Sequence, residues 1–202
     1  MSSTAILITC IAILAQCLVI ALYALLRAYR KLSFYKIPPQ IFFIADTHFD
    51  DSYAVKKSPF HSTRTMNEVI RNNWNRKVSR RDIIYVLGDF CAHRYHYWCA
   101  ILNGKKIFIR GNHDKGGNKY FEYITLGDRK FLLLHDPCKV PPDYDGWAIH
   151  GHIHESYMVN TGRKLFCVSV LPPKIGPISK LDLAMIKQQP WTTFFASHPT
   201  PV

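Results

Sequence analysis

The chain has 202 residues, of which 26 are Lys or Arg and 14 are Asp or Glu, so its formal net charge is +12. With 48% hydrophobic and 20% charged residues, the composition is that of a folded protein and excludes a disordered chain, a collagen or a repeat array. The six cysteines are scattered without a CxxC spacing. This pattern excludes a disulfide framework or a zinc knuckle and favours a reducing compartment.

The first predicted element is an apolar helix over residues 5–26. No charged residue interrupts this stretch, and at about 1.5 Å per residue it is long enough to span the apolar core of a bilayer. It is apolar on every face, unlike a core helix, and it lacks the basic n-region and clear cleavage site of a signal peptide, the main alternative. Arg27, Arg30 and Lys31 follow this helix directly. We therefore expect a single-pass membrane protein with residues 1–4 outside and the residues after the helix in the cytoplasm.

The soluble part is predicted to be a basic juxtamembrane linker over residues 27–39, one folded domain over 40–187 and a flexible tail over 188–202. Within the domain, short apolar segments separated by helical patterns predict buried strands. The predicted strands cover residues 41–45, 83–87, 106–109, 131–134, 147–149 and 165–171, the predicted helices cover 66–78 and 94–102, and a hairpin turn is predicted at 126–129. Helices and strands alternate before strands dominate, which favours an α/β sandwich with a mixed sheet.

Polar residues follow five of these predicted strands directly. In chain order they are Asp46-Thr47-His48, Gly88-Asp89, Gly111-Asn112-His113-Asp114, His135-Asp136 and His150-Gly151-His152-Ile153-His154. Ligands of open α/β sheets bind just beyond the carboxyl ends of the strands, so we expect these side chains to converge in one place.

The chemistry of these side chains indicates a metal centre. Their donors are imidazole nitrogens and carboxylate or amide oxygens without a thiolate, a set that suits Mn²⁺ first, and also Fe, Zn²⁺, Mg²⁺, Co²⁺ or Ni²⁺. The candidate ligands are Asp46, His48, Asp89, Asn112, His135, His152 and His154. Seven donors exceed the needs of one tetrahedral ion and suit two ions that share a carboxylate such as Asp89. Two divalent ions would leave the site electropositive, as a phosphate ester requires.

In this order, the motifs DxH, GD, GNHD, a single His and GHxH resemble those of the calcineurin-like metallophosphoesterase family. The resemblance covers about residues 41–179 and is nearest to the small, uncapped bacterial and phage-type members, through Asp46-Thr47-His48-Phe49, Asn73-Trp74-Asn75 and Val86-Leu87-Gly88-Asp89-Phe90. It implies a four-layer α/β/β/α sandwich after the transmembrane helix. It also implies that one metal takes Asp46, His48, Asp89 and His154, and the other Asp89, Asn112, His135 and His152.

The function that the resemblance implies is hydrolysis of a phosphomonoester or phosphodiester by a hydroxide that bridges two metals. By the same resemblance His113 assists the leaving group and Asp114 orients His113. His150 and residues 50–62 match no motif position, and Arg110 is as readily a solvated side chain as a phosphate contact. Two alternatives stay open: a nuclease of the same chemistry, suggested by the net charge although no nucleic-acid-binding motif accompanies it, and a non-catalytic metal-binding scaffold at the membrane.

Overall fold

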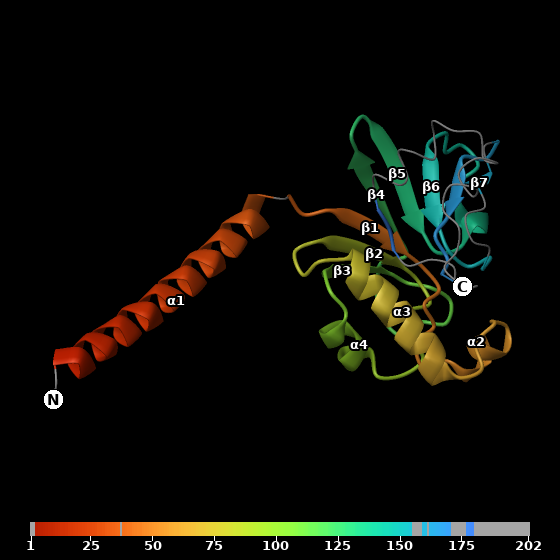
Figure 1. Cartoon of the computed structure of the whole chain (residues 1–202). Helices are drawn as coiled ribbons and strands as arrows, with labels where there is room; N and C mark the ends of the chain where they lie inside the picture. Colours follow the sequence, from red (N-terminus) through yellow and green to blue (C-terminus); the bar gives the residue numbers. More distant parts are fainter. Residues whose placement is uncertain (1–2, 37, 155–158, 161, 171–176, 180–202) are drawn as a thin grey trace. The chain divides into compact units, whose positions relative to one another are not determined.

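The computed structural model describes residues 3–36, 38–154, 159–160, 162–170 and 177–179. By their internal contacts, the residues fall into two compact units, Met1–Pro39 and Gln40–Val202. Figure 1 labels the elements of both units. Within the described part of the chain, the first unit forms one helix, and the second holds the strands and every candidate ligand.

The first unit is helix α1 (Ser3–Lys36). It continues through the basic residues that follow the apolar stretch, so the segment predicted as a linker is helical as far as Lys36. Ser3–Arg30 is long and apolar enough to cross a membrane. Length and composition alone do not separate a membrane span from a signal sequence or a core helix, and large apolar side chains along α1 such as Leu18 and Leu25 are exposed.

The second unit contains two β-sheets. The first has the strand order β3-β2-β1-β9, in which β1 (Ile41–Ile44), β2 (Ile83–Leu87) and β3 (Lys105–Ile109) are parallel and β9 (Ile178–Ser179) is antiparallel to β1. The second has the order β4-β5-β6-β8-β7, formed by β4 (Phe121–Leu126), β5 (Arg129–Leu134), β6 (Trp147–His150), β8 (Leu165–Cys167) and β7 (Val159–Asn160). The apolar segments predicted a mixed sheet, and the family resemblance implied two β-layers. The structure divides the strands between two sheets, each of which is mixed.

Helices cover the outer face of the first sheet (Figure 1). They are α2 (Ser52–Lys56), α3 (Thr63–Lys77) and α4 (Tyr95–Ile101). Helix α3 begins where the hydroxyl of Ser62 accepts a hydrogen bond from the backbone N–H of Thr65, as N-cap residues do. Its buried residues Met66, Ile70 and Trp74 recur every four positions and therefore share one face, which packs on the sheet.

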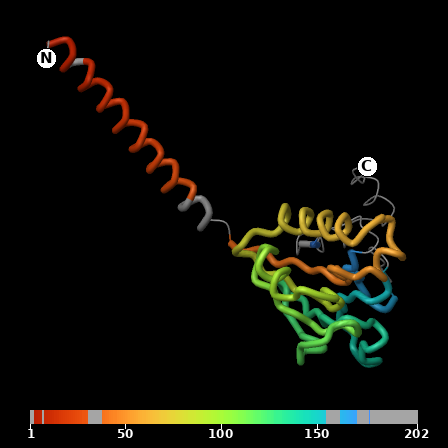
Figure 2. Tube along the Cα trace, turned by 90° about the horizontal axis from the view of Figure 1, so that it is seen from below, coloured from red at the N-terminus to blue at the C-terminus, as the bar shows by residue number. Residues whose placement is uncertain are grey.

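The two sheets pack face to face around a second core. Phe43 and Leu87 of the first sheet contact Leu133, Ile149 and Phe166 of the second in one buried cluster. Figure 2 shows the resulting layers, with α3 on one side and the second sheet on the other. Among the described residues, α-helices form only one outer layer, so the second helical layer of the predicted sandwich is not seen there; the predicted tail lies outside those residues.

The two sheets are joined next to the carboxyl end of β1. Ala45 donates a backbone hydrogen bond to the carbonyl of Val168 (3.0 Å) and accepts one from the N–H of Val170 (3.1 Å). β1, β2 and β3 are mutually parallel, as are β5, β6 and β8. The loops that follow these strands therefore meet where the sheets join, and the expected convergence of polar side chains has a structural basis.

Candidate metal centre

Four candidate ligands lie together at the ends of β1, β2 and β6. They are Asp46, His48, Asp89 and His154, and each offers one nitrogen or oxygen atom within 4.8 Å of the others. The first three are buried and His154 is half-buried. Such a set of two carboxylates and two imidazoles suits a first-row divalent ion.

The other three candidate ligands form a second group beside the first. The side-chain oxygen of Asn112 lies 2.8 Å from Nε2 of His135 and 3.0 Å from Nδ1 of His152. The two imidazole nitrogens are 3.3 Å apart. All seven predicted ligands are therefore brought to one place, in two adjacent groups.

Asp89 lies between the two groups. Its Oδ2 atom is 3.6 Å from Nε2 of His48 in the first group and 3.3 Å from Nε2 of His135 in the second. Its other oxygen, Oδ1, accepts a hydrogen bond of 2.9 Å from the backbone N–H of His113. One carboxylate oxygen thus faces an imidazole of each group, which is the placement that a bridging ligand needs.

The backbone is left-handed at most of these ligands. The φ angles are 55° at Asp46, 43° at His48, 53° at Asp89, 72° at His152 and 52° at His154. Non-glycine residues adopt this conformation at a cost of about 1–3 kcal/mol each, and such residues cluster at functional sites. The sharp turn after each strand is what directs these side chains across the edge of the sheet.

Glycines in two of the motifs let backbone approach the ligands closely. A Cβ atom on Gly111 would lie 2.2 Å from Oδ1 of Asp89, and a Cβ on Gly88 would lie 2.4 Å from Nδ1 of His135. Gly88 also has a φ of 88°, a conformation that L side chains rarely adopt. Both positions therefore require glycine for the ligands to stay in place.

Two histidines are oriented by hydrogen bonds on the side away from the site. Nδ1–H of His135 donates to the carbonyl of Leu87 (2.8 Å), and Nδ1–H of His48 donates to Oδ2 of Asp51 (3.0 Å). These bonds leave Nε2 of each ring facing the other ligands, as in metal sites whose second nitrogen is held by the protein. Nε2 of His48 is buried and has no hydrogen-bond partner in the described structure. A buried polar atom without a partner is costly, and a cation would supply one, so the residues fit a metal ion.

Burial and charge shift the pKa values of the acidic ligands in opposite directions. Burial raises the pKa of Asp46 to about 7, and the charge of His135 only partly offsets this effect. Burial also acts to raise the pKa of Asp89, but the hydrogen bond and charge of His135, with the backbone hydrogen bond of His113 and the charge of His48, together outweigh it and hold that pKa at about 2. Burial, together with the charge of His48, lowers the pKa of His154 to about 4. A lowered pKa leaves an imidazole neutral and ready to bind a metal.

The structure places the two predicted catalytic residues differently from each other. His113 is exposed, and its ring lies edge-on to that of His48 at a centroid distance of 5.5 Å. The carboxylate of Asp114 accepts hydrogen bonds from the backbone N–H groups of Asp89 (2.9 Å), Phe90 (3.0 Å) and Gly111 (2.8 Å). Asp114 therefore ties the loop after β3 to the loop after β2, a contact that the sequence did not predict, and its role toward His113 stays a prediction.

His150 is not among the converging donors. It is buried on β6, and its Nδ1–H donates to the carbonyl of Gly151 at 2.8 Å. Burial lowers the pKa of His150, so the ring stays neutral within the core.

Two residues of the segment that matched no motif support the site. Asp51 holds His48 and also caps α2, because its Oδ1 accepts from the backbone N–H groups of Tyr53 (2.8 Å) and Ala54 (3.3 Å). Asp50 accepts from Arg94 on one oxygen at 2.5 Å and from the indole N–H of Trp98 on the other at 2.7 Å, which fixes the same loop to α4. The aspartate directly before a short helical segment is the sequence signal for Asp51.

Comparison with known proteins decides the family. A model of the calcineurin-like phosphoesterase family matches residues 39–171 of this chain. The chain belongs to the calcineurin-like phosphoesterase family. It is 39% identical over 157 residues to the uncharacterized protein MJ1445 of Methanocaldococcus jannaschii, a match that covers 71% of this chain and 88% of that protein.

The fold of this calcineurin-like phosphoesterase is also found in a crystal structure. The protein of unknown function AQ665 from Aquifex aeolicus matches it with a TM-score of 0.57 and 24% identity, over 73% of this chain and 99% of that chain. The match to the family model and the identity to MJ1445 confirm the family assignment made from the five motifs. Members of this family typically bind divalent metals, and the group of Asp46, His48, Asp89 and His154 is the candidate site for one of them.

The pKa of Asp46 makes metal binding depend on pH. Below pH 7 the carboxyl binds a proton that a metal must displace, and the raised pKa of His135 acts in the same direction. We expect the apparent affinity for Mn²⁺ to rise from pH 6 to pH 8, with more protons released on binding at pH 6 than at pH 8. Calorimetry in buffers of different ionisation enthalpy measures both quantities. An affinity that stays constant over this range would show that neither group is a ligand.

The two functions of Asp51 can be separated by substitution. Asp51→Asn keeps an oxygen that caps α2 but loses the charge that holds His48. We expect this variant to unfold at nearly the same temperature as the unaltered protein and to bind Mn²⁺ about 10-fold to 100-fold more weakly. Asp128→Asn, which changes an exposed aspartate in the turn after β4, is the matched control. Full affinity in Asp51→Asn would mean that His48 needs no partner on its outer nitrogen.

Proposed function

We propose that this chain is a metal-dependent hydrolase of phosphomonoesters or phosphodiesters. One observation carries the proposal: Asp89 places a single carboxylate oxygen 3.6 Å from an imidazole nitrogen of one donor group and 3.3 Å from one of the other. Paired metals that share a ligand are the usual arrangement for displacement at phosphorus. Membership of the phosphoesterase family supports the same reaction.

We assign the first metal to Asp46, His48, Asp89 and His154 and the second to Asp89, Asn112, His135 and His152. When bound, two divalent ions, with Mn²⁺ the first candidate, would supply an activated water and neutralise charge on the phosphoryl group. The carboxylates of Asp46 and Asp89 balance only half of the charge of two such ions. The remaining positive charge favours an anionic substrate, as a phosphoester is.

The protein's own residues then position and protonate the reacting groups. His113 is exposed beside His48, so its ring is free to donate a proton to the oxygen that leaves phosphorus. Its backbone N–H is held by Asp89, and Asp114 fixes the loop on which it lies. The backbone of His113 is therefore fixed to the carboxylate that the two groups share. This bond keeps the proton donor beside the site.

Substitution separates the roles of the shared ligand and the proton donor. We expect EDTA to abolish hydrolysis of an aryl phosphate ester and Mn²⁺ to restore it. Asp89→Asn should lose both metal occupancy and turnover, because both groups share this carboxylate. His113→Ala should keep about two metals per chain, by elemental analysis, while turnover falls about 10²–10⁴-fold.

His61→Ala is the matched control, since His61 is exposed and lies outside both groups. Full activity in the presence of chelator would contradict the two-metal assignment. Loss of metal from His113→Ala would make His113 a ligand instead of a proton donor.

We also infer that α1 anchors the phosphoesterase domain to a membrane, with the domain on the cytoplasmic side. The support is an apolar helix of sufficient length followed by basic residues, which are retained on the cytoplasmic side and attract anionic lipid. A helix satisfies its own backbone hydrogen bonds and is therefore compatible with a lipid environment.

Extraction tests the anchor. The full chain should pellet with membranes, stay there in high salt or carbonate, and dissolve in detergent. Deletion of residues 1–39 should release a domain that still binds metals, because every candidate ligand lies at Asp46 or beyond. The domain should also be protected from protease added outside intact cells. Release of a soluble exported product cleaved near residue 26 would identify a signal peptide instead.

A further inference from the structure

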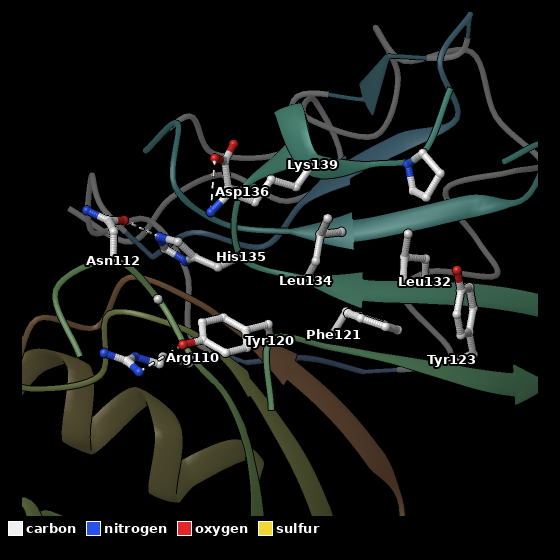
Figure 3. A pocket seen from close by; sticks show the side chains of 12 residues that line it. Arg110, Asn112, Tyr120, Phe121, Tyr123, Leu132, Leu134, His135, Asp136 and Lys139 are labelled. Carbon is white, nitrogen blue, oxygen red and sulfur yellow. Dashed lines mark hydrogen bonds and ion pairs between the residues drawn. The ribbon is translucent and has the colours of Figure 1, made fainter. Parts of the chain in front are cut away.

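A pocket of about 320 Å³ opens beside the second donor group (Figure 3). Asn112 and His135, both assigned to the second metal, form part of its lining, together with Gly111. A molecule whose phosphoryl group lies at the metal centre therefore has a cavity next to it for the rest of its structure. Ligand pockets in proteins start at about this volume.

Part of the pocket wall is apolar and carries three aromatic side chains. Tyr120, Phe121 and Tyr123 line one side along β4, and Leu132 and Leu134 of β5 line the side next to them (Figure 3). The two leucines are buried, whereas the three aromatic side chains are between 53% and 58% exposed. Phe121 and Tyr123 contact each other edge to face at a centroid distance of 5.8 Å.

Phe121 and Tyr123 stand on the outer face of β4, and Tyr120 directly precedes this strand. The opposite face of the same strand contributes Ile124 and Leu126 to the core between the sheets. Packing between the sheets therefore explains the residues on one face of β4. Phe121 and Tyr123 do not belong to this core. Large exposed aromatic side chains that line a cavity are typical of a binding surface.

Charged residues lie at the rim. The guanidinium of Arg110 donates to the hydroxyl of Tyr120 at 3.0 Å and lies 5.5 Å from the centre of its ring. Nζ of Lys139 is 3.9 Å from Oδ2 of Asp136. Arg110 lies between β3 and the GNHD motif. Its contact with the ring of Tyr120 holds it in the lining of the pocket.

We propose that this pocket binds a flat aromatic ring carried by the phosphoester, either a nucleobase or a simple aryl group. The assignment rests on the proposed function, since the pocket takes its position from the metal centre. A ring stacks on Phe121 and Tyr123 while its phosphoryl group reaches Asn112 and His135. The volume suits one nucleoside-sized group and is too small for the two long acyl chains of a membrane phospholipid.

Phosphonates test the proposal without being hydrolysed. Binding to the full chain in detergent with Mn²⁺ is measured for four compounds: methylphosphonate, benzylphosphonate, octylphosphonate and the phosphonate analogue of a nucleoside 5′-monophosphate. We expect at least one of the two ring-bearing compounds to bind roughly tenfold or more tightly than methylphosphonate. The compound with the larger advantage distinguishes an aryl group from a nucleobase.

Variants locate the effect. Phe121→Ala and Tyr123→Ala should abolish the advantage of the ring and leave the binding of methylphosphonate unchanged. Both side chains are exposed, so neither substitution removes core packing. Tyr97→Ala, at an exposed tyrosine of α4 outside the pocket lining, should keep the advantage in full.

Each contrary result has a distinct meaning. Equal binding of all four compounds, or an advantage that survives both pocket variants, overturns the pocket while the proposed function stands. Tighter binding of octylphosphonate than of either ring overturns the aromatic ring and assigns an alkyl group instead. If methylphosphonate itself fails to bind in the presence of Mn²⁺, the proposed function is contradicted. The pocket proposal, which rests on that function, is then overturned as well.

Discussion

The arrangement of this domain depends on one carboxylate that must face two sets of imidazoles at the same time. Asp89 follows β2 of the first sheet, yet it contacts His135, which follows β5 of the second. That contact requires the carboxyl ends of strands from both sheets to meet, as the backbone bonds of Ala45 to the segment after β8 allow. The loop after β3 is held against Asp89 by two bonds: the backbone N–H of His113 donates to the carboxylate of Asp89, and Asp114 accepts from the backbone N–H of Asp89.

The protein alone does not balance the electrostatics of this site. Burial raises the pKa of Asp46, and Nε2 of His48 is buried without a hydrogen-bond partner among the described residues, so both groups are less favourable than they would be in water. Left-handed backbone at five of the ligands adds to this cost. Two large hydrophobic clusters, one under the helices and one between the sheets, supply the compensating stability. A bound cation relieves the electrostatic part of the cost, which couples metal binding to the stability of the domain.

The sequence predicted the parts of this structure that have a local signal. Apolar segments predicted the buried strands, and glycines and metal-ligating residues marked the ends of these strands. The turn at Gly127 and Asp128 joins β4 to β5 as expected. The apolar segments alone did not predict how the strands divide between two sheets, because such a segment carries no information about its pairing partner; the two β-layers followed only from the family resemblance. The bonds of Asp114 to the loop after β2 and the bond of Asp51 to His48 were not predicted, because the partners of both carboxylates depend on how separate loops meet.

The motifs do not identify the substrate either. Metal ligands recognise phosphorus and its charge, which all phosphoesters share, so discrimination has to come from groups beyond the ligands. In this domain the pocket beside the second donor group is lined in part by Tyr120, Phe121 and Tyr123. Side chains alternate along β4, so one face of the strand packs into the core. Core packing does not constrain the residues of the other face, which carries the aromatic rings of Phe121 and Tyr123. Specificity can therefore change on this strand without disturbing either the sheet or the metal centre.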